Sequence, residues 1–107
     1  MHIAVVNFHL KDMTHDQFAA VCDQIAPTWA AIPGLISKVW LSDPASNTYG
    51  GVYLWEDRPA FEAFAAGELA AGMAKNPNFT DLSIRDFDVL DAPTRVTRGM
   101  PTAGARA

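Results

Sequence analysis

The chain has 107 residues, of which 50% are hydrophobic and 19% are charged, and this composition predicts one globular domain with a modest core. Its net charge is −4, but residues 1–91 carry all 12 acidic residues and five basic ones, a charge of −7. An acidic domain lacks the basic surface that nucleic acid or an anionic membrane requires, so we expect neither as a partner.

Membrane-spanning segments, secretion signals and disulfide-forming cysteines would also be visible in the sequence. No apolar run is long enough to cross a bilayer, and the N-terminus enters a strand pattern without a secretory signal. Cys22 is the lone cysteine, so no internal disulfide can form. These features predict a cytoplasmic protein.

The first half of the chain predicts a strand, a helix and a hairpin. Residues 3–10 alternate as a β-strand. Thr14 and Gln17 have the spacing of a capping box, which predicts a helix of roughly 15–18 residues. Residues 35–42 and 48–56 then form two strands around a polar turn. The Gly50-Gly51 pair in the second of these indicates a bulge or a close approach to the backbone.

The second half predicts a helix, a strand and a tail. Asp57 is the expected N-cap of one helix that ends at Asn76-Pro77-Asn78. The last strand covers about residues 81–90, with a bulge near Arg85-Asp86 where its apolar positions change phase. We expect residues 1–91 to form the domain, and residues 92–107 to be a flexible tail or an arm on a partner chain.

The element order β-α-β-β-α-β predicts an α+β, ferredoxin-like fold. Two helices then cover one face of a four-stranded antiparallel sheet and leave the other face open. An open face rich in large apolar residues needs a cover, so we expect a homodimer in which two such faces meet.

Strand parity predicts which residues face this opening. The aliphatic positions are the expected partners of the helices: Ala4, Val6, Phe8, Leu35, Val39, Leu41, Val52 and Leu54. Polar and aromatic residues share the opposite parity, and we expect them to line a pocket for a small hydrophobic or aromatic molecule. They are Asn7, His9, Lys38, Trp40, Gly51, Tyr53 and Trp55, with Arg85 or Phe87 from the last strand.

Three of these residues are candidate catalytic groups. His9 could act as a general base near neutral pH, or it could make a hydrogen bond at the end of its strand. Lys38 could stabilise a phenolate or enolate, or it could pair with Glu56 or with a carboxylate of the partner chain. Tyr53 could donate a hydrogen bond to a substrate oxygen, as could Asn7.

The remaining candidates would bind substrate rather than react. Trp40 and Trp55, together with Tyr53, could stack on a flat molecule or form the dimer core. Phe87 is a further candidate for substrate binding. Arg85 has the same two interpretations as Lys38, with Asp86 and Asp88 as nearby ion-pair partners. Gly51 could make room for the ligand. We predict no metal site, because no two histidines are placed as a ligand pair.

Several segments of the chain resemble the YdhR-type mono-oxygenases of the dimeric α+β barrel superfamily, which also contains the antibiotic-biosynthesis monooxygenases. The resemblance covers residues 3–91 and is carried by Pro33-Gly34-Leu35, Lys38-Val39-Trp40, Gly50-Gly51-Val52-Tyr53-Leu54 and the helix start from Ala60-Phe61 to Phe64.

This resemblance implies a homodimer with one pocket per subunit and oxygenation of a small aromatic or quinol-like compound. It further implies chemistry with O2 and no metal, flavin or haem, in which the enzyme holds the deprotonated substrate. Two alternatives stay open: a non-catalytic barrel that binds a small molecule, and a cyclase or isomerase on the same fold.

Overall fold

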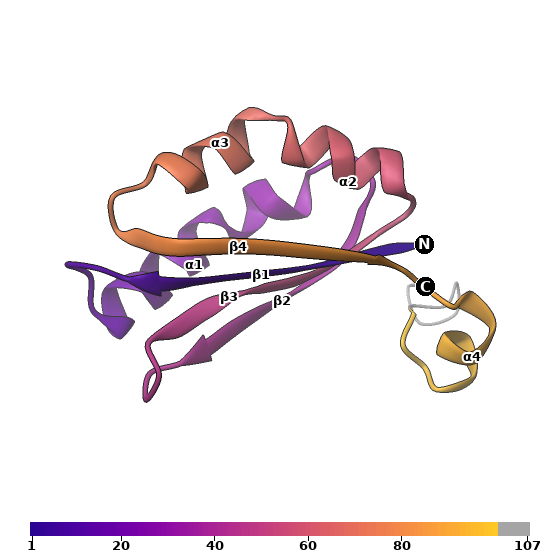
Figure 1. Ribbon diagram of the computed structural model, residues 1–107, viewed down its shortest axis with the longest axis horizontal. Helices are drawn as coiled ribbons and strands as arrows, with labels where there is room; N and C mark the ends of the chain where they lie inside the picture. The colour runs from indigo at the N-terminus through magenta and orange to yellow at the C-terminus, as the bar shows by residue number, and fades with distance from the viewer. Residues whose placement is uncertain (101–107) are drawn as a thin grey trace.

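Four strands form one antiparallel sheet in the computed structural model of the chain, which describes residues 1–100 (Figure 1). The strands are β1 (His2–Leu10), β2 (Leu35–Asp43), β3 (Thr48–Trp55) and β4 (Phe79–Asp88), in the spatial order β2-β3-β1-β4. All neighbouring pairs run antiparallel. The predicted ferredoxin-like fold class is therefore confirmed.

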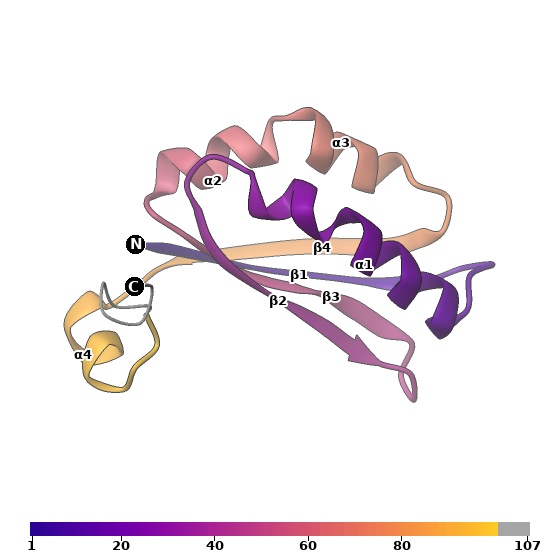
Figure 2. The same cartoon turned by 180° about the vertical axis from the view of Figure 1, so that it is seen from behind.

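Three helices cover one face of this sheet: α1 (His15–Ala30), α2 (Arg58–Ala65) and α3 (Glu68–Lys75) (Figures 1 and 2). The capping box of α1 is confirmed, because the Gln17 amide donates to Thr14 Oγ1 and the Thr14 amide donates to the Gln17 side chain. Within residues 1–100, no helix covers the opposite face of the sheet.

The second predicted helix is two helices. Asp57 caps α2 as expected, accepting a hydrogen bond of 2.9 Å from the Ala60 amide. Helix α2 ends at Ala65, with Ala66 as its C-cap, and Gly67 is the N-cap of α3 in an extended conformation. The prediction of one continuous helix was wrong because glycine has a low helix propensity and readily adopts the extended backbone of a helix start.

The predicted bulge in the last strand was also misplaced. The β1–β4 register is continuous from Asp88 to Ser83 and shifts before Thr80. Asp81 lies at the shift with a positive φ of 54°. The apparent change of phase in the apolar positions of the strand has another cause. Asp86 and Asp88 are polar residues on the helix side, whereas Phe87 is an apolar residue on the opposite face.

The helix-facing side of the sheet differs from the predicted one. Burial alternates along β1, with Ala4, Val6 and Phe8 at 1–4% exposure, as expected. In β3, however, Tyr53 pairs with Ala4 and Gly51 pairs with Val6, so the aromatic positions of β3 share the helix side. The prediction assigned the aliphatic positions of β2 and β3 to the helices. It holds for Leu35, which pairs with Trp55 and packs against the core, but elsewhere in these strands the aromatic side chains fill that layer.

Gly50 supports the close-approach interpretation of the glycine pair, since neither β3 pairing shifts register there. Its φ is 152°, which an L side chain rarely adopts, and an added Cβ would overlap the backbone carbonyl of Val6. The β1–β3 pairing therefore requires a glycine at this position.

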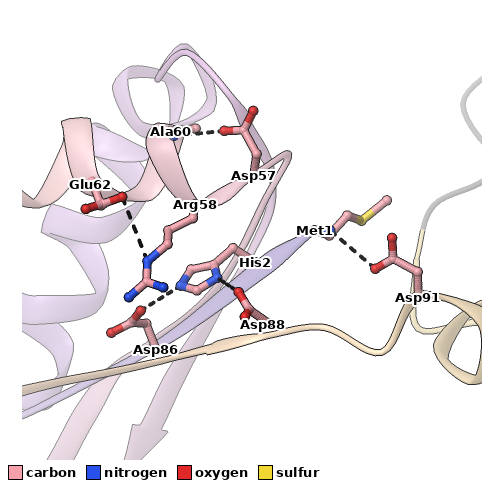
Figure 3. Close-up of polar contacts among 9 residues, drawn as sticks. All are labelled: Met1, His2, Asp57, Arg58, Ala60, Glu62, Asp86, Asp88 and Asp91. Atoms are coloured by element: carbon pink, nitrogen blue, oxygen red, sulfur yellow. Dashed lines mark hydrogen bonds and ion pairs between the residues drawn. The ribbon is translucent and has the colours of Figure 1, made fainter.

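A buried histidine joins the start of β1 to the end of β4 (Figure 3). His2 is 2% exposed, and its ring nitrogens lie 2.6 Å from Asp86 Oδ2 and 2.9 Å from Asp88 Oδ1. Each ring nitrogen thus has a carboxylate oxygen as its hydrogen-bond partner, and the two contacts join β1 to β4. The Met1 amine extends this connection to Asp91 at the start of α4 (Asp91–Val96), at 3.2 Å.

The predicted tail begins with this unpredicted helix. In both views α4 lies beyond the strand ends, on the side of the sheet away from α1–α3 (Figures 1 and 2). The rest of the predicted tail, residues 101–107, lies outside the described residues.

Across residues 1–100, no helix combines the length and the apolar composition that crossing a membrane would need.

The glycine requirement gives a direct test of the β1–β3 pairing. We expect Gly50→Ala to lower the free energy of unfolding by at least about 2 kcal/mol, because the new methyl group meets backbone that cannot move aside. Gly72→Ala, where nothing lies within 4 Å of an added Cβ, is the matched control and should gain up to about 1 kcal/mol. Urea unfolding measures both; equal effects would contradict the packing.

Candidate active site

An apolar cavity of about 300 Å³ lies between the sheet and the helices. Strands β1 to β4 form its floor, and α1 and α3 form its walls. Its lining is aromatic and aliphatic with few polar groups, which is the usual character of a small-molecule site. The lining residues are Phe8, Phe18, Val21, Ile25, Trp29, Lys38, Trp40, Gly50, Tyr53, Glu68, Leu69, Gly72, Met73, Asn76 and Phe79.

The amine of Lys38 is enclosed by three aromatic rings. Its Nζ lies 3.3 Å from the ring centroid of Trp40, 4.6 Å from that of Tyr53 and 5.0 Å from that of Trp29. All three are within cation–π range. Among residues 1–100 no carboxylate lies within ion-pair distance of this amine, so the predicted salt bridge to Glu56 is not formed.

Burial in this apolar site lowers the pKa of Lys38 to about 7. The attraction of the Cys22 thiolate works in the opposite direction. That attraction is small near neutral pH, because burial raises the pKa of the Cys22 thiol and keeps it protonated. The ring faces also favour the ammonium. Lys38 can therefore gain or lose a proton near neutral pH, as a general base must.

Gly51 and Tyr53 position the lysine from the neighbouring strand. A Cβ on Gly51 would lie 2.7 Å from Lys38 Cε and 3.2 Å from Tyr53 Cε1, so the missing side chain makes room for the lysine stem. The Tyr53 hydroxyl accepts a hydrogen bond of 3.2 Å from Trp29 Nε1. Burial raises the pKa of Tyr53, so it remains a phenol whose own proton can be donated.

The structure thus brings together three of the predicted site residues, Lys38, Trp40 and Tyr53, with Gly51 beneath them. It does so under the helices rather than on the open sheet face. Trp55 shares this side but is fully buried, stacked on Tyr53 at 6.0 Å, and belongs to the core outside the cavity lining.

The other predicted residues lie on the opposite face of the sheet. His9 is at the strand end, with Nδ1 2.8 Å from the Asn47 carbonyl oxygen, so the structure supports the strand-end interpretation. Asn7 shares its parity. Arg85 pairs with Val5 and stacks over Phe87 at 5.6 Å, while Asp86 and Asp88 bind His2 instead of Arg85. None of these four lines the cavity.

The sequence analysis missed the helix side of the site. This side consists of Phe18, Ile25 and Trp29 on α1 and of Leu69 and Met73 on α3, none of which was among the predicted site residues. A usable signal was the presence of bulky aromatic residues on both a helix and the facing strand, because small-molecule sites are lined mainly by apolar and aromatic side chains.

No group of three or more metal-binding side chains occurs within the described residues 1–100. The cavity lining itself holds one amine, one phenol, one carboxylate and one amide, from Lys38, Tyr53, Glu68 and Asn76.

Comparison with known proteins finds the same family. A family model described as "Putative mono-oxygenase ydhR" matches residues 3–100. No curated protein matches the chain.

Solved structures match the fold over most of the chain. The haem-degrader MhuD from Mycobacterium tuberculosis is 22% identical with a TM-score of 0.67, over 84% of this chain and 96% of that one. The cofactor-independent oxygenase SnoaB from Streptomyces nogalater is 18% identical with a TM-score of 0.63, over 85% and 95%. An antibiotic biosynthesis monooxygenase-type protein from Deinococcus radiodurans is 18% identical with a TM-score of 0.68, over 86% and 95%.

The lowered pKa of Lys38 predicts a rise in stability with pH. Between pH 7 and about 10.4 the folded chain holds fewer protons at this residue than the unfolded chain, so the free energy of unfolding increases as pH rises. We expect wild type to gain about 1–3 kcal/mol relative to Lys38→Met across this window, allowing for partial exposure of the amine. Urea unfolding at several pH values measures this difference.

The exposed Lys75 provides the control, since Lys75→Met should follow wild type at every pH. A wild-type profile parallel to that of Lys38→Met would show that the Lys38 amine is not desolvated in the folded chain.

Proposed function

The chain belongs to the family described as "Putative mono-oxygenase ydhR", and we propose that it is a cofactor-independent monooxygenase that oxidises a small aromatic or quinol-like compound. The observation that carries this proposal is the Lys38 amine, which lies among three aromatic rings in an apolar cavity and has no counter-ion among residues 1–100. This geometry supports proton removal from a flat, electron-rich substrate.

Proton transfer from a phenol to Lys38 is energetically feasible. A phenol has a pKa of about 10, so transfer to an amine with a pKa of about 7 is uphill by 3 units, or about 4 kcal/mol. The product is an ammonium next to a phenolate, and such a pair is worth about 4 kcal/mol at 4 Å and an effective dielectric of 20. This attraction offsets the difference in pKa. Burial of the phenolate opposes the transfer, as it does for Tyr53, and a hydrogen bond from the Tyr53 hydroxyl would favour the anion.

O2 then accepts electrons from this anion. A new C–O bond forms at the ring carbon para to the oxygen, giving a peroxide, and the O–O bond breaks as the C–H bond at that carbon is lost. A phenol and O2 thereby become a quinone and water, with one oxygen atom in each product. The proton held by Lys38 can return to the leaving hydroxide, so the residue ends as it began.

Tyr53 and Trp40 complete the proposed site. The Tyr53 phenol can donate a hydrogen bond to the substrate oxygen, since its existing bond from Trp29 uses the oxygen only as an acceptor. The Trp40 ring, a wall of the cavity, can stack on a flat substrate. His9 is not needed as the base, because Lys38 performs that role inside the cavity.

A non-catalytic binding protein is the second candidate, and the aromatic lining of the cavity favours it. Full neutralisation of Lys38 by an ion pair would have strengthened this alternative, but no such pair forms within residues 1–100. A cyclase or isomerase would use the same base without consuming O2.

The decisive experiment is oxygen uptake by the purified chain over a panel of phenols, naphthols and quinols, with the quinone followed by absorbance. We expect Lys38→Met to lower kcat/KM by about 10²–10⁴-fold, because it removes the base while keeping the length of the side chain. Lys75→Met should leave the rate unchanged. His9→Gln should also retain activity, since its ring lies on the other sheet face.

Each alternative has its own result. Tight binding of one compound without uptake would favour a binding protein, and a product of unchanged mass would indicate isomerisation. A shifted haem absorption band on titration would place the chain with haem-binding neighbours such as MhuD. Loss of activity in His9→Gln with full activity in Lys38→Met would overturn the site.

We further propose that the open sheet face pairs with a second copy of the chain. This face carries an apolar surface on which Val39 is 59% exposed and Phe87 is 47% exposed, and a monomer would leave it in water. Ile3, Val5 and Val52 share the face by register. The cavity lies on the other side of the sheet, so a homodimer would hold two separate sites.

Val39→Glu tests this pairing, because it would bury an unpaired carboxylate in each half of the interface, at a cost of several kcal/mol. We expect wild type to have the mass of a dimer in light scattering and Val39→Glu to have that of a monomer. Lys75→Glu on α3 serves as the control and should stay dimeric. A monomeric wild type would contradict the proposal.

A further inference from the structure

Lys38 differs from the other two lysines of the chain in its surroundings. Lys11 and Lys75 are exposed, whereas Lys38 is half-buried in an apolar cavity with three ring faces around its amine. A lysine in water is almost wholly ammonium near neutral pH and has no free lone pair. A lysine amine in an apolar pocket loses its proton more easily and then has a free lone pair. A desolvated lysine of this kind is a nucleophile toward carbonyl compounds.

We propose that Lys38 is a covalent capture site, whose amine forms an imine with an aromatic aldehyde or ketone bound in the cavity between the sheet and the helices. This proposal rests on the geometry of the cavity and does not require the oxygenase activity. It adds a substrate class, aromatic carbonyl compounds, to the phenols considered above.

The step needs no reagent beyond the amine and the carbonyl compound. The Nζ lone pair attacks the carbonyl carbon, the C=O π bond opens, and a proton moves from nitrogen to oxygen to give a carbinolamine. Loss of water then forms the C=N bond, and addition of water reverses the reaction. No electron transfer occurs, and the lysine is regenerated on hydrolysis.

The surroundings of the amine select the aromatic class. Trp29, Trp40 and Tyr53 place flat π surfaces about the reacting nitrogen, and offset or edge contacts with a further ring favour an aryl group over a short alkyl chain. The Tyr53 hydroxyl can donate to the carbonyl oxygen and polarise it for attack. Gly51 leaves open the space through which the lysine stem reaches this position.

Reductive trapping tests the proposal on the full chain. The protein is incubated with benzaldehyde and sodium cyanoborohydride at pH 7.5, which converts an imine irreversibly to a secondary amine, and peptide mass spectrometry locates the benzyl group. We expect Lys38 to be labelled on the order of 10- to 100-fold faster than Lys11 and Lys75, since burial in the cavity lowers the pKa of its amine and raises the neutral fraction. Propanal, the aliphatic probe, should label Lys38 more slowly than benzaldehyde.

Each outcome decides a separate point. Equal labelling of the three lysines, or none at Lys38, would overturn the capture site. Faster labelling of Lys38 by propanal would overturn the aromatic class. Because trapping is read on wild-type protein, it needs no variant that must fold. Labelling of Lys38 without oxygen uptake would support the capture site and contradict the oxygenase proposal. Oxygen uptake without labelling of Lys38 would support the oxygenase proposal and overturn the capture site.

Discussion

The contact of the Lys38 amine with three aromatic rings is the interaction on which the candidate site depends. Trp40 and Tyr53 come from the sheet and Trp29 from α1, so the amine is held at the junction of the two layers. The rings attract the ammonium, while removal from water disfavours it. The balance leaves a titratable group in an apolar cavity, and both proposed reactions use its lone pair.

The two faces of the sheet consequently have separate tasks. The helix-covered face carries the large aromatic side chains and the cavity, and the open face carries smaller aliphatic residues such as Val39 and Val52. Two neighbouring glycines of β3 allow this arrangement. Gly50 lets β3 approach the backbone of β1, and Gly51 leaves room for the side chain of Lys38. Contacts at the strand ends, such as His2 with Asp86 and Asp88, hold the outer strand in register without entering the site.

Membership of the family establishes a mono-oxygenase relationship, but the fold neighbours differ in chemistry. One degrades haem and another is a cofactor-independent oxygenase, on the same fold and at similar low identity. A shared fold therefore does not select the reaction, and the residues of the cavity must. Here they are one amine, one phenol, one carboxylate and one amide among apolar side chains, which suits proton transfer and carbonyl chemistry on flat substrates.

The sequence by itself determined the fold class, the caps of α1 and α2 and the grouping of Lys38, Trp40 and Tyr53, because capping and alternation are local properties of the chain. It could not determine which face of β2 and β3 meets the helices. That choice depends on the register with β1, in which Tyr53 pairs with Ala4, and on how much volume the helices leave to be filled. Tertiary packing therefore decides that the pocket lies under the helices and that His9 and Asn7, which were predicted to line it, lie on the opposite face of the sheet.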